Sequence, residues 1–188
     1  MAVPFIRKYL AFGLVGGFTY VALHFTIYLI NPERIIDPFL KLIPIIPVIL
    51  SMLYAIQFRI NKSKLDDLVY RDLVQSSFIT FIVMETLYVA YTYLLYNQIH
   101  VLIFPDAATL DEVLKVALIK SETIRYDQLG GVPKQKYEMM IAHIQAEDYT
   151  FPIDRALKGL FQWYIIGFGF SFLLAMFGMN RVKSLRNG

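Results

Sequence analysis

The chain has 188 residues, of which 57% are hydrophobic and 18% are charged, and it contains no cysteine. This composition exceeds the apolar content of a soluble domain, and the lack of cysteine excludes disulfides, thiolate catalysis and zinc–thiolate sites. The net charge of +3 requires no nucleic-acid partner, because basic residues flank the apolar segments and would face anionic lipid headgroups. We therefore expect an all-α membrane protein that lies in a lipid bilayer.

Four long apolar runs predict four transmembrane helices, because a bilayer core about 30 Å thick requires about 20 helical residues. The first run follows Arg7 and Lys8, and it is too long for the apolar region of a signal peptide, so we expect a retained helix. Three prolines in and before the second run, Pro38, Pro44 and Pro47, predict an irregular helix entry. The runs are Tyr9 to Ile30, Leu42 to Phe58, Leu73 to Tyr96 and Gly159 to Met179.

Small residues in the first and fourth runs predict close packing of helix backbones, either within the bundle or against a partner subunit or second copy. Aromatic residues near the ends of the third and fourth runs predict an outer interfacial belt. The packing candidates are Gly13, Gly16, Gly17, Gly167 and Gly169, and the belt candidates include Tyr91, Tyr93, Tyr96, Trp163 and Tyr164.

Basic residues predict that both termini are cytoplasmic. The terminal segments and the connection between the second and third runs hold nine Lys and Arg residues against three Asp. The remaining basic residues are spread over a long region, and lysine and arginine close to span ends favour the cytoplasmic side. We expect a multi-pass protein of a bacterial inner membrane.

The region between the third and fourth runs predicts an extracytoplasmic amphipathic helical insertion. We therefore divide the chain into three helices at 1–96, the insertion at 97–158, and the fourth helix with a basic tail at 159–188. Thr109 and Glu112 form a predicted capping box that opens one helix, which ends near Gly130. A second helix is expected from Pro133 to about Glu147. Their apolar faces must lie on the bilayer, on each other or on another protein.

Glu85 is the sharpest candidate for an intramembrane polar site, because it falls near the middle of the third run. A charged carboxylate there costs about 2.5–3.5 kcal/mol, so the group is expected to face the bundle and to pair or take up a proton. Because no second acid accompanies Glu85 in the apolar runs, a structural role as a packing or assembly contact is favoured over a proton or cation site. Counted along the apolar runs, several polar residues lie at a similar depth in the bilayer and would form a polar layer around Glu85. They are Tyr20, His24, Ser51 and Ser171, with Thr19 and Thr86.

No catalytic or cofactor motif is present in the sequence. The three histidines lack metal-site spacing, and no nucleophile elbow, phosphate loop or dinucleotide fingerprint occurs. His143 and Glu147 share a helix face, but two ligands are fewer than zinc takes. We expect neither a metal, nor a cofactor, nor an enzymatic activity.

Two family resemblances can be drawn from the layout. The chain has two closely spaced spans, a basic loop, a third span ending in Tyr91-Thr-Tyr-Leu-Leu-Tyr-Asn and a charged outer region before Pro152. This layout resembles an uncharacterised family of small four-span inner-membrane proteins of Bacteroidetes. The opening Phe5-Ile-Arg-Lys-Tyr-Leu-Ala-Phe-Gly-Leu-Val-Gly-Gly is similar to GtrA-like proteins, which have short loops. The first resemblance implies a bacterial inner membrane, and the second implies handling of polyprenyl-linked sugars.

Two functions are compatible with these features. The first is a non-enzymatic accessory or scaffold subunit of a bacterial envelope membrane complex, supported by the small-residue faces and the outer region. The alternative is a small transporter or GtrA-like protein that handles polyprenyl-linked sugars, supported by Glu85 and the proline-rich second run.

Overall fold

The structure is a computed structural model of the chain, and it describes residues 3–32, 43, 45–104, 109–129 and 133–187. Every regular element in those ranges is a helix. Four helices are long and apolar enough to cross a membrane, which confirms the predicted fold class at that level. These stretches are Phe5–Ile30, Ile45–Lys62, Tyr70–Ile103 and Ile153–Arg186.

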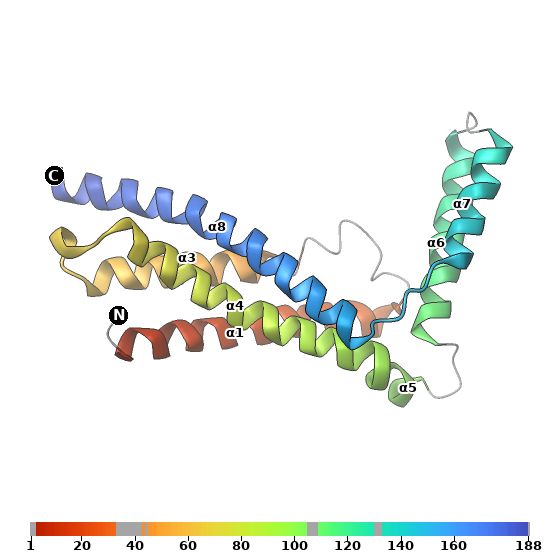
Figure 1. Cartoon of the computed structure of the whole chain (residues 1–188), viewed down its shortest axis with the longest axis horizontal. Helices are drawn as coiled ribbons and strands as arrows, with labels where there is room; N and C mark the ends of the chain where they lie inside the picture. The colour runs from red at the N-terminus through yellow and green to blue at the C-terminus, as the bar shows by residue number, and fades with distance from the viewer. Residues whose placement is uncertain (1–2, 33–42, 44, 105–108, 130–132, 188) are drawn as a thin grey trace.

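The four long helices form a bundle in which α4 (Tyr70–Leu94) contacts all three of the others. The others are α1 (Val3–Ile30), α3 (Ile45–Lys62) and α8 (Ile153–Asn187). Both chain termini lie at the same end of the bundle, as does the link between α3 and α4 (Figure 1). We call this the terminal end, and it gathers the basic segments that the sequence placed on one side.

Arginine side chains tie the helices together at the terminal end. Arg59 pairs with Asp72 at 3.2 Å, and its guanidinium lies 4.4 Å from the ring centroid of Phe5. Arg181 donates to Gln57 of α3 at 2.6 Å. Arg186 donates to backbone carbonyls next to the 3₁₀ turn η2 (Leu65–Asp67). The basic residues therefore have structural partners as well as the expected role at a lipid surface.

The second long helix begins later than the sequence predicted. α3 starts at Ile45, so Pro47 occupies the first turn, where backbone N–H groups have no carbonyl partner within the helix. Its missing N–H therefore removes no interior hydrogen bond, and Pro47 itself causes no irregularity of the kind expected at the helix entry. Pro38 and Pro44 lie outside the described residues.

Helices α6 (Leu110–Leu129) and α7 (Lys134–Ala146) form a hairpin at the end opposite the termini, where it stands across the long axis of the bundle (Figure 1). The predicted capping box is confirmed, because the Thr109 N–H donates to Glu112 Oε2 at 2.9 Å and the Glu112 N–H donates to Thr109 Oγ1 at 3.3 Å. We call this end the hairpin end.

The two hairpin helices pack on each other and on the bundle. The hydroxyls of Thr123 and Tyr137 are 2.8 Å apart, and the Tyr137 ring stacks on Tyr126. At the base, Leu110 and Leu114 are buried against aromatic side chains of α1 and α4. Part of the apolar surface of the hairpin thus lies between the two helices and against the end of the bundle, while Val116, Ile124 and Met139 stay exposed.

A short link returns the chain from the hairpin to α8. Asp148 accepts a hydrogen bond from the Thr150 N–H at 2.8 Å, and hydrogen bonds from the Thr150 side chain and backbone hold the pKa of Asp148 below its ordinary value. Arg155 donates to the carbonyls of both residues. The Pro152 carbonyl accepts the first helical hydrogen bond from the Ala156 N–H, and α8 begins at Ile153, six residues before the fourth apolar run.

A π-helical turn, η3 (Leu95–Ile99), interrupts the third long helix before α5 (His100–Ile103). The His100 N–H bonds to the Leu95 carbonyl, five residues earlier instead of four. Such a turn accommodates one extra residue without rotating the helix beyond it. As a result His100 is buried on the same side of the helix as Leu95.

Glycines of α1 and α8 permit close approach to α4. A Cβ added at Gly13 would lie 2.8 Å from the backbone oxygen of Thr80, and one at Gly17 would lie 3.2 Å from the Cα of Met84. A Cβ at Gly167 would overlap the ring of Phe81. These approaches are closer than packed carbon atoms adopt, so the absent side chains set the helix spacing.

The remaining small residues differ in role. A Cβ at Gly16 would overlap Ser51 Oγ of α3, whereas one at Gly169 would meet nothing within 4 Å among the described residues. Gly178, which was not selected from the sequence, contacts Ile56 of α3. The structure thus brings four of the five selected glycines against neighbouring helices and leaves Gly169 facing open space.

Replacing Gly13 with Ala is expected to destabilise the bundle by about 1–3 kcal/mol, because the new methyl group meets the Thr80 backbone. The matched change Gly169→Ala should be neutral or slightly stabilising, since alanine favours helix. Thermal unfolding in detergent, followed by the fluorescence of the single tryptophan, measures both. Equal melting temperatures for the two variants would contradict the packing account.

Deleting Gln98, an exposed residue of η3, is expected to convert the π turn to an α turn and to leave His100 buried. Deleting the exposed Ala90 from the regular part of α4 should rotate everything beyond it by about 100° and lower the melting temperature strongly. The same fluorescence melt compares the two deletions. Similar damage from both would show that the π turn does not absorb an extra residue.

Candidate intramembrane polar site

Glu85 is buried inside the bundle, with 5% of its surface exposed. It lies close to the centre of the Tyr70–Ile103 stretch. Its carboxyl acts electrostatically on the phenols of Tyr20 from α1 and Tyr88 from α4. The carboxyl therefore faces the α1–α4 interface, as expected of an acidic residue at this depth.

Aromatic and imidazole rings continue from Glu85 toward the hairpin end. The rings of Tyr20 and Tyr88 stack with centroids 4.2 Å apart. His24 packs edge-on against both Tyr88 and Tyr91, and its Nδ1 lies 3.2 Å from the Tyr91 hydroxyl. His24 is thus one helical turn beyond Tyr20 on the same face of α1.

A second hydrogen-bonded pair lies one further turn along α1. The hydroxyl of Tyr28 is 2.8 Å from His100 Nδ1, and both residues are almost completely buried. The ring of Phe25 packs against both Tyr28 and Tyr91, so it occupies the step between the two pairs. We call Glu85 together with these six Tyr and His side chains the polar string: Tyr20, Tyr88, His24, Tyr91, Tyr28 and His100.

The α1 members of the polar string could have been predicted from their spacing in the sequence, which the comparison of depths in the bilayer did not use. Tyr20, His24 and Tyr28 recur every four residues, which places them on one face of a helix. Tyr91, expected at the lipid interface, is instead buried against His24, so the belt prediction is wrong at this residue. No spacing rule would have found His100, because only the π turn brings it onto this face.

The α8 side of this level is also polar. The Tyr164 hydroxyl lies 2.7 Å from Thr86 Oγ1. The interfacial position of Tyr164 stays a prediction. Ser171 is fully buried and donates to the Gly167 carbonyl of its own helix at 2.8 Å. These hydroxyls are satisfied by α4 and α8 themselves.

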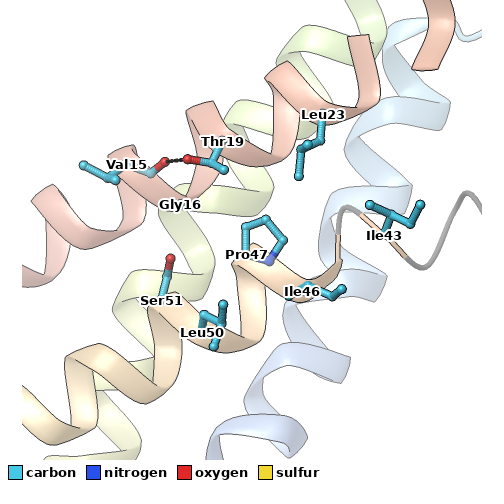
Figure 2. Close-up of a pocket in the computed structure, with 9 residues that line it drawn as sticks. All are labelled: Val15, Gly16, Thr19, Leu23, Ile43, Ile46, Pro47, Leu50 and Ser51. Carbon is cyan, nitrogen blue, oxygen red and sulfur yellow. Dashed lines mark hydrogen bonds between the residues drawn. The ribbon is translucent and has the colours of Figure 1, made fainter. Parts of the chain in front are cut away.

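Ser51 and Thr19 border a separate groove between α1 and α3 (Figure 2). The groove has a volume of about 340 Å³ and a mostly apolar lining. The Thr19 hydroxyl donates to the Val15 carbonyl at 2.8 Å, so it is satisfied within α1 (Figure 2). The lining residues are Val15, Gly16, Thr19, Leu23, Ile43, Ile46, Pro47, Leu50 and Ser51.

The arrangement of the polar string suits proton chemistry better than metal binding. Among the described residues, no group of three or more His, Asp and Glu side chains is placed to hold a metal ion. His143 and Glu147, 3.7 Å apart on α7, are both well exposed and form an ordinary helix-surface pair. Tyrosine hydroxyls and imidazoles, in contrast, each donate and accept hydrogen bonds, as a proton relay requires.

Comparisons of the chain with protein-family models, with curated proteins and with solved structures found no match. The two resemblances given above therefore stay predictions that rest on the quoted residues. What the chain does has to be argued from its bundle, its hairpin and its polar string.

Replacing Tyr91 with Phe removes the hydrogen bond to His24 and should cost about 1 kcal/mol of unfolding free energy, as buried polar contacts between membrane helices do. The matched change Tyr93→Phe should leave stability unchanged, because the Tyr93 side chain makes no hydrogen bond within the part of the chain that the structure describes. Unfolding in mixed micelles with increasing denaturant measures both variants. Equal stability of the two would contradict a structural role for the His24–Tyr91 pair.

Proposed function

We propose that this chain is a non-enzymatic accessory or scaffold subunit of a bacterial inner-membrane complex. In this proposal the four long helices cross the bilayer, both termini are cytoplasmic, and the hairpin of α6 and α7 lies outside and binds a partner protein. The observation that carries the proposal is the position of the hairpin, which stands across the bundle at the end opposite the termini (Figure 1).

The base of the hairpin is fixed to the rest of the chain by hydrogen bonds and apolar contacts, which suits a hairpin that binds a partner protein. Asp111 accepts a hydrogen bond from the Tyr149 N–H at 2.7 Å and pairs with Lys115 at 3.0 Å. Leu110 and Leu114 are buried on the bundle end. A partner bound to the hairpin would therefore be held in a defined orientation relative to the bundle.

The surface of the hairpin has the mixed character of a protein-binding face. Three large apolar side chains, Val116, Ile124 and Met139, stay exposed among charged residues. Protein interfaces commonly combine apolar anchors with a polar rim. The charged neighbours form the ion pairs Arg125–Glu122 and Lys134–Glu138 along the helix surfaces, and these suit a rim in contact with water.

The distribution of charge supports the proposed orientation. The terminal end carries Arg59, Arg181 and Arg186 with the other basic residues of those segments, and positive charge near span ends favours the cytoplasm. The hairpin carries acidic and basic residues in similar numbers. The hairpin would then face the outer side of the membrane.

The test is purification of the full chain in mild detergent, followed by identification and quantitation of co-purifying membrane proteins. Met139→Asp should remove a stoichiometric partner, because it places a charge at the most exposed apolar residue of the hairpin. The matched control Leu185→Asp, at the terminal end, should retain the partner. A chain that purifies without any stoichiometric partner would contradict the subunit proposal.

The groove between α1 and α3 favours a second candidate, a small transporter or a GtrA-like protein that handles polyprenyl-linked sugars. Its apolar walls and its volume of about 340 Å³ suit part of a single isoprenoid or acyl chain (Figure 2). A lone, monodisperse protein whose melting temperature rises with a polyprenyl phosphate, and not with a phospholipid of equal charge, would favour this candidate over the first.

A further inference from the structure

The polar string joins the middle of the bundle to its hairpin end along the α1–α4 interface. It begins at Glu85, and its last member, His100, lies beyond the π turn next to the hairpin base. The α1 members Tyr20 and Tyr28 are eight residues apart, which corresponds to about 12 Å along a helix. We propose that this interface is a proton path between Glu85 and the hairpin end, and this holds whether or not the chain binds a partner.

Burying ionisable side chains in the bundle costs free energy, which argues for a role beyond filling space. His24, Glu85 and His100 are each less than 10% exposed, in a bundle whose outer surface is apolar. Ionisable residues inside a membrane are costly and are recurrently used in proton relays. Here they are aligned by helix spacing instead of being scattered, and hydroxyls of tyrosine separate them.

Each step of the path is a proton exchange between neighbouring groups. A proton from water at the hairpin end binds the imidazole of His100 while its other N–H proton or the Tyr28 hydroxyl proton moves on. The His24–Tyr91 pair repeats the exchange one turn further in. In the last transfer an O–H bond of the Tyr20 or Tyr88 phenol breaks and an O–H bond forms on the Glu85 carboxylate, and the phenol regains a proton from the His24 side. Every step forms one O–H or N–H bond and breaks another, and no electron is transferred.

Proton transfer between the Tyr28–His100 pair and the His24–Tyr91 pair is the slowest step of the path. Phe25 packs against Tyr28 and Tyr91, and the two pairs are separated by one turn of α1, about 6 Å. A rotation of one phenol or a single water molecule would bridge this turn. Phe25 therefore limits the rate at which a proton passes.

The groups that face Glu85 come from two helices. The Glu85 carboxyl acts electrostatically on the titratable phenols of Tyr20 from α1 and Tyr88 from α4, and the hydroxyl of Tyr164 from α8 lies 2.7 Å from that of Thr86, the next residue along α4. At this level α3 contributes Val48 and Met52, which do not titrate. The described residues thus place no cation beside Glu85, and the path has to supply a proton.

The hairpin base covers the outer end of the path. Leu110 and Leu114 pack in one cluster with Tyr28, Tyr91 and Leu95. Asp111, directly after the first of these leucines, accepts a hydrogen bond from the Tyr149 backbone N–H. Movement of the hairpin base would therefore open or close the path to water.

The test measures how fast Glu85 exchanges its proton for deuterium. The full chain in lipid nanodiscs is moved from H₂O to D₂O, and the infrared carbonyl band of protonated Glu85, assigned by its loss in Glu85→Gln, is followed in time. Tyr28→Phe, which removes one hydroxyl and keeps the ring, should slow the exchange about tenfold, as should His100→Phe.

Tyr164→Phe is the matched control, because its hydroxyl is hydrogen-bonded to Thr86, the residue after Glu85, and among the described residues it makes no hydrogen bond to a member of the polar string. It should exchange at the rate of the unmodified chain. The proposal is overturned by unchanged exchange in Tyr28→Phe, by equal slowing in Tyr164→Phe, or by the absence of a protonated Glu85 band at every pH at which the chain stays folded. Because no partner is added, these outcomes are independent of the scaffold proposal.

Discussion

The close contact of α1 with α4 is the interaction on which the rest of the structure depends. Lipid surrounds a membrane bundle with material as apolar as its own side chains, so packing instead of water exclusion must hold the helices together. Gly13 and Gly17 bring the α1 backbone against α4, and this spacing lets the rings of Tyr20 and Tyr88 stack. The same spacing brings His24 to Tyr91 and Tyr28 to His100. The polar string is therefore a consequence of small residues that carry no chemistry themselves.

The bundle and the hairpin are mechanically connected through the end of α4. The π turn keeps His100 on the interior face, and the aromatic cluster around Tyr28 and Leu95 receives the first turns of α6. A displacement of the hairpin by a bound partner would act on this cluster first. The proposed scaffold function and the proposed proton path share one structural element, and neither proposal requires the other.

Much of the fold was predictable from the sequence, because the constraints of a bilayer are simple. Run lengths predicted four long helices, and T-x-x-E spacing predicted the start of α6 at Thr109. The contacts of single residues were harder to predict, since the position of a residue along a helix does not specify toward which neighbour its side chain points. Depth selected Ser51 and Ser171 beside Glu85, whereas Ser51 borders the α1–α3 groove and Ser171 bonds within α8. His100 depended on a local change of helix pitch, for which the sequence carries no simple pattern.

We propose that the bundle crosses a membrane with both termini on one side and the hairpin on the other. The chain has no cysteine, so single cysteines can be introduced without further changes. Ser121→Cys in α6 and Ser184→Cys near the C-terminus are both exposed. In intact bacteria, a maleimide that does not cross membranes should label the cysteine at 121, and should label the one at 184 only after lysis. Labelling of both before lysis, or of 184 alone, would contradict the account.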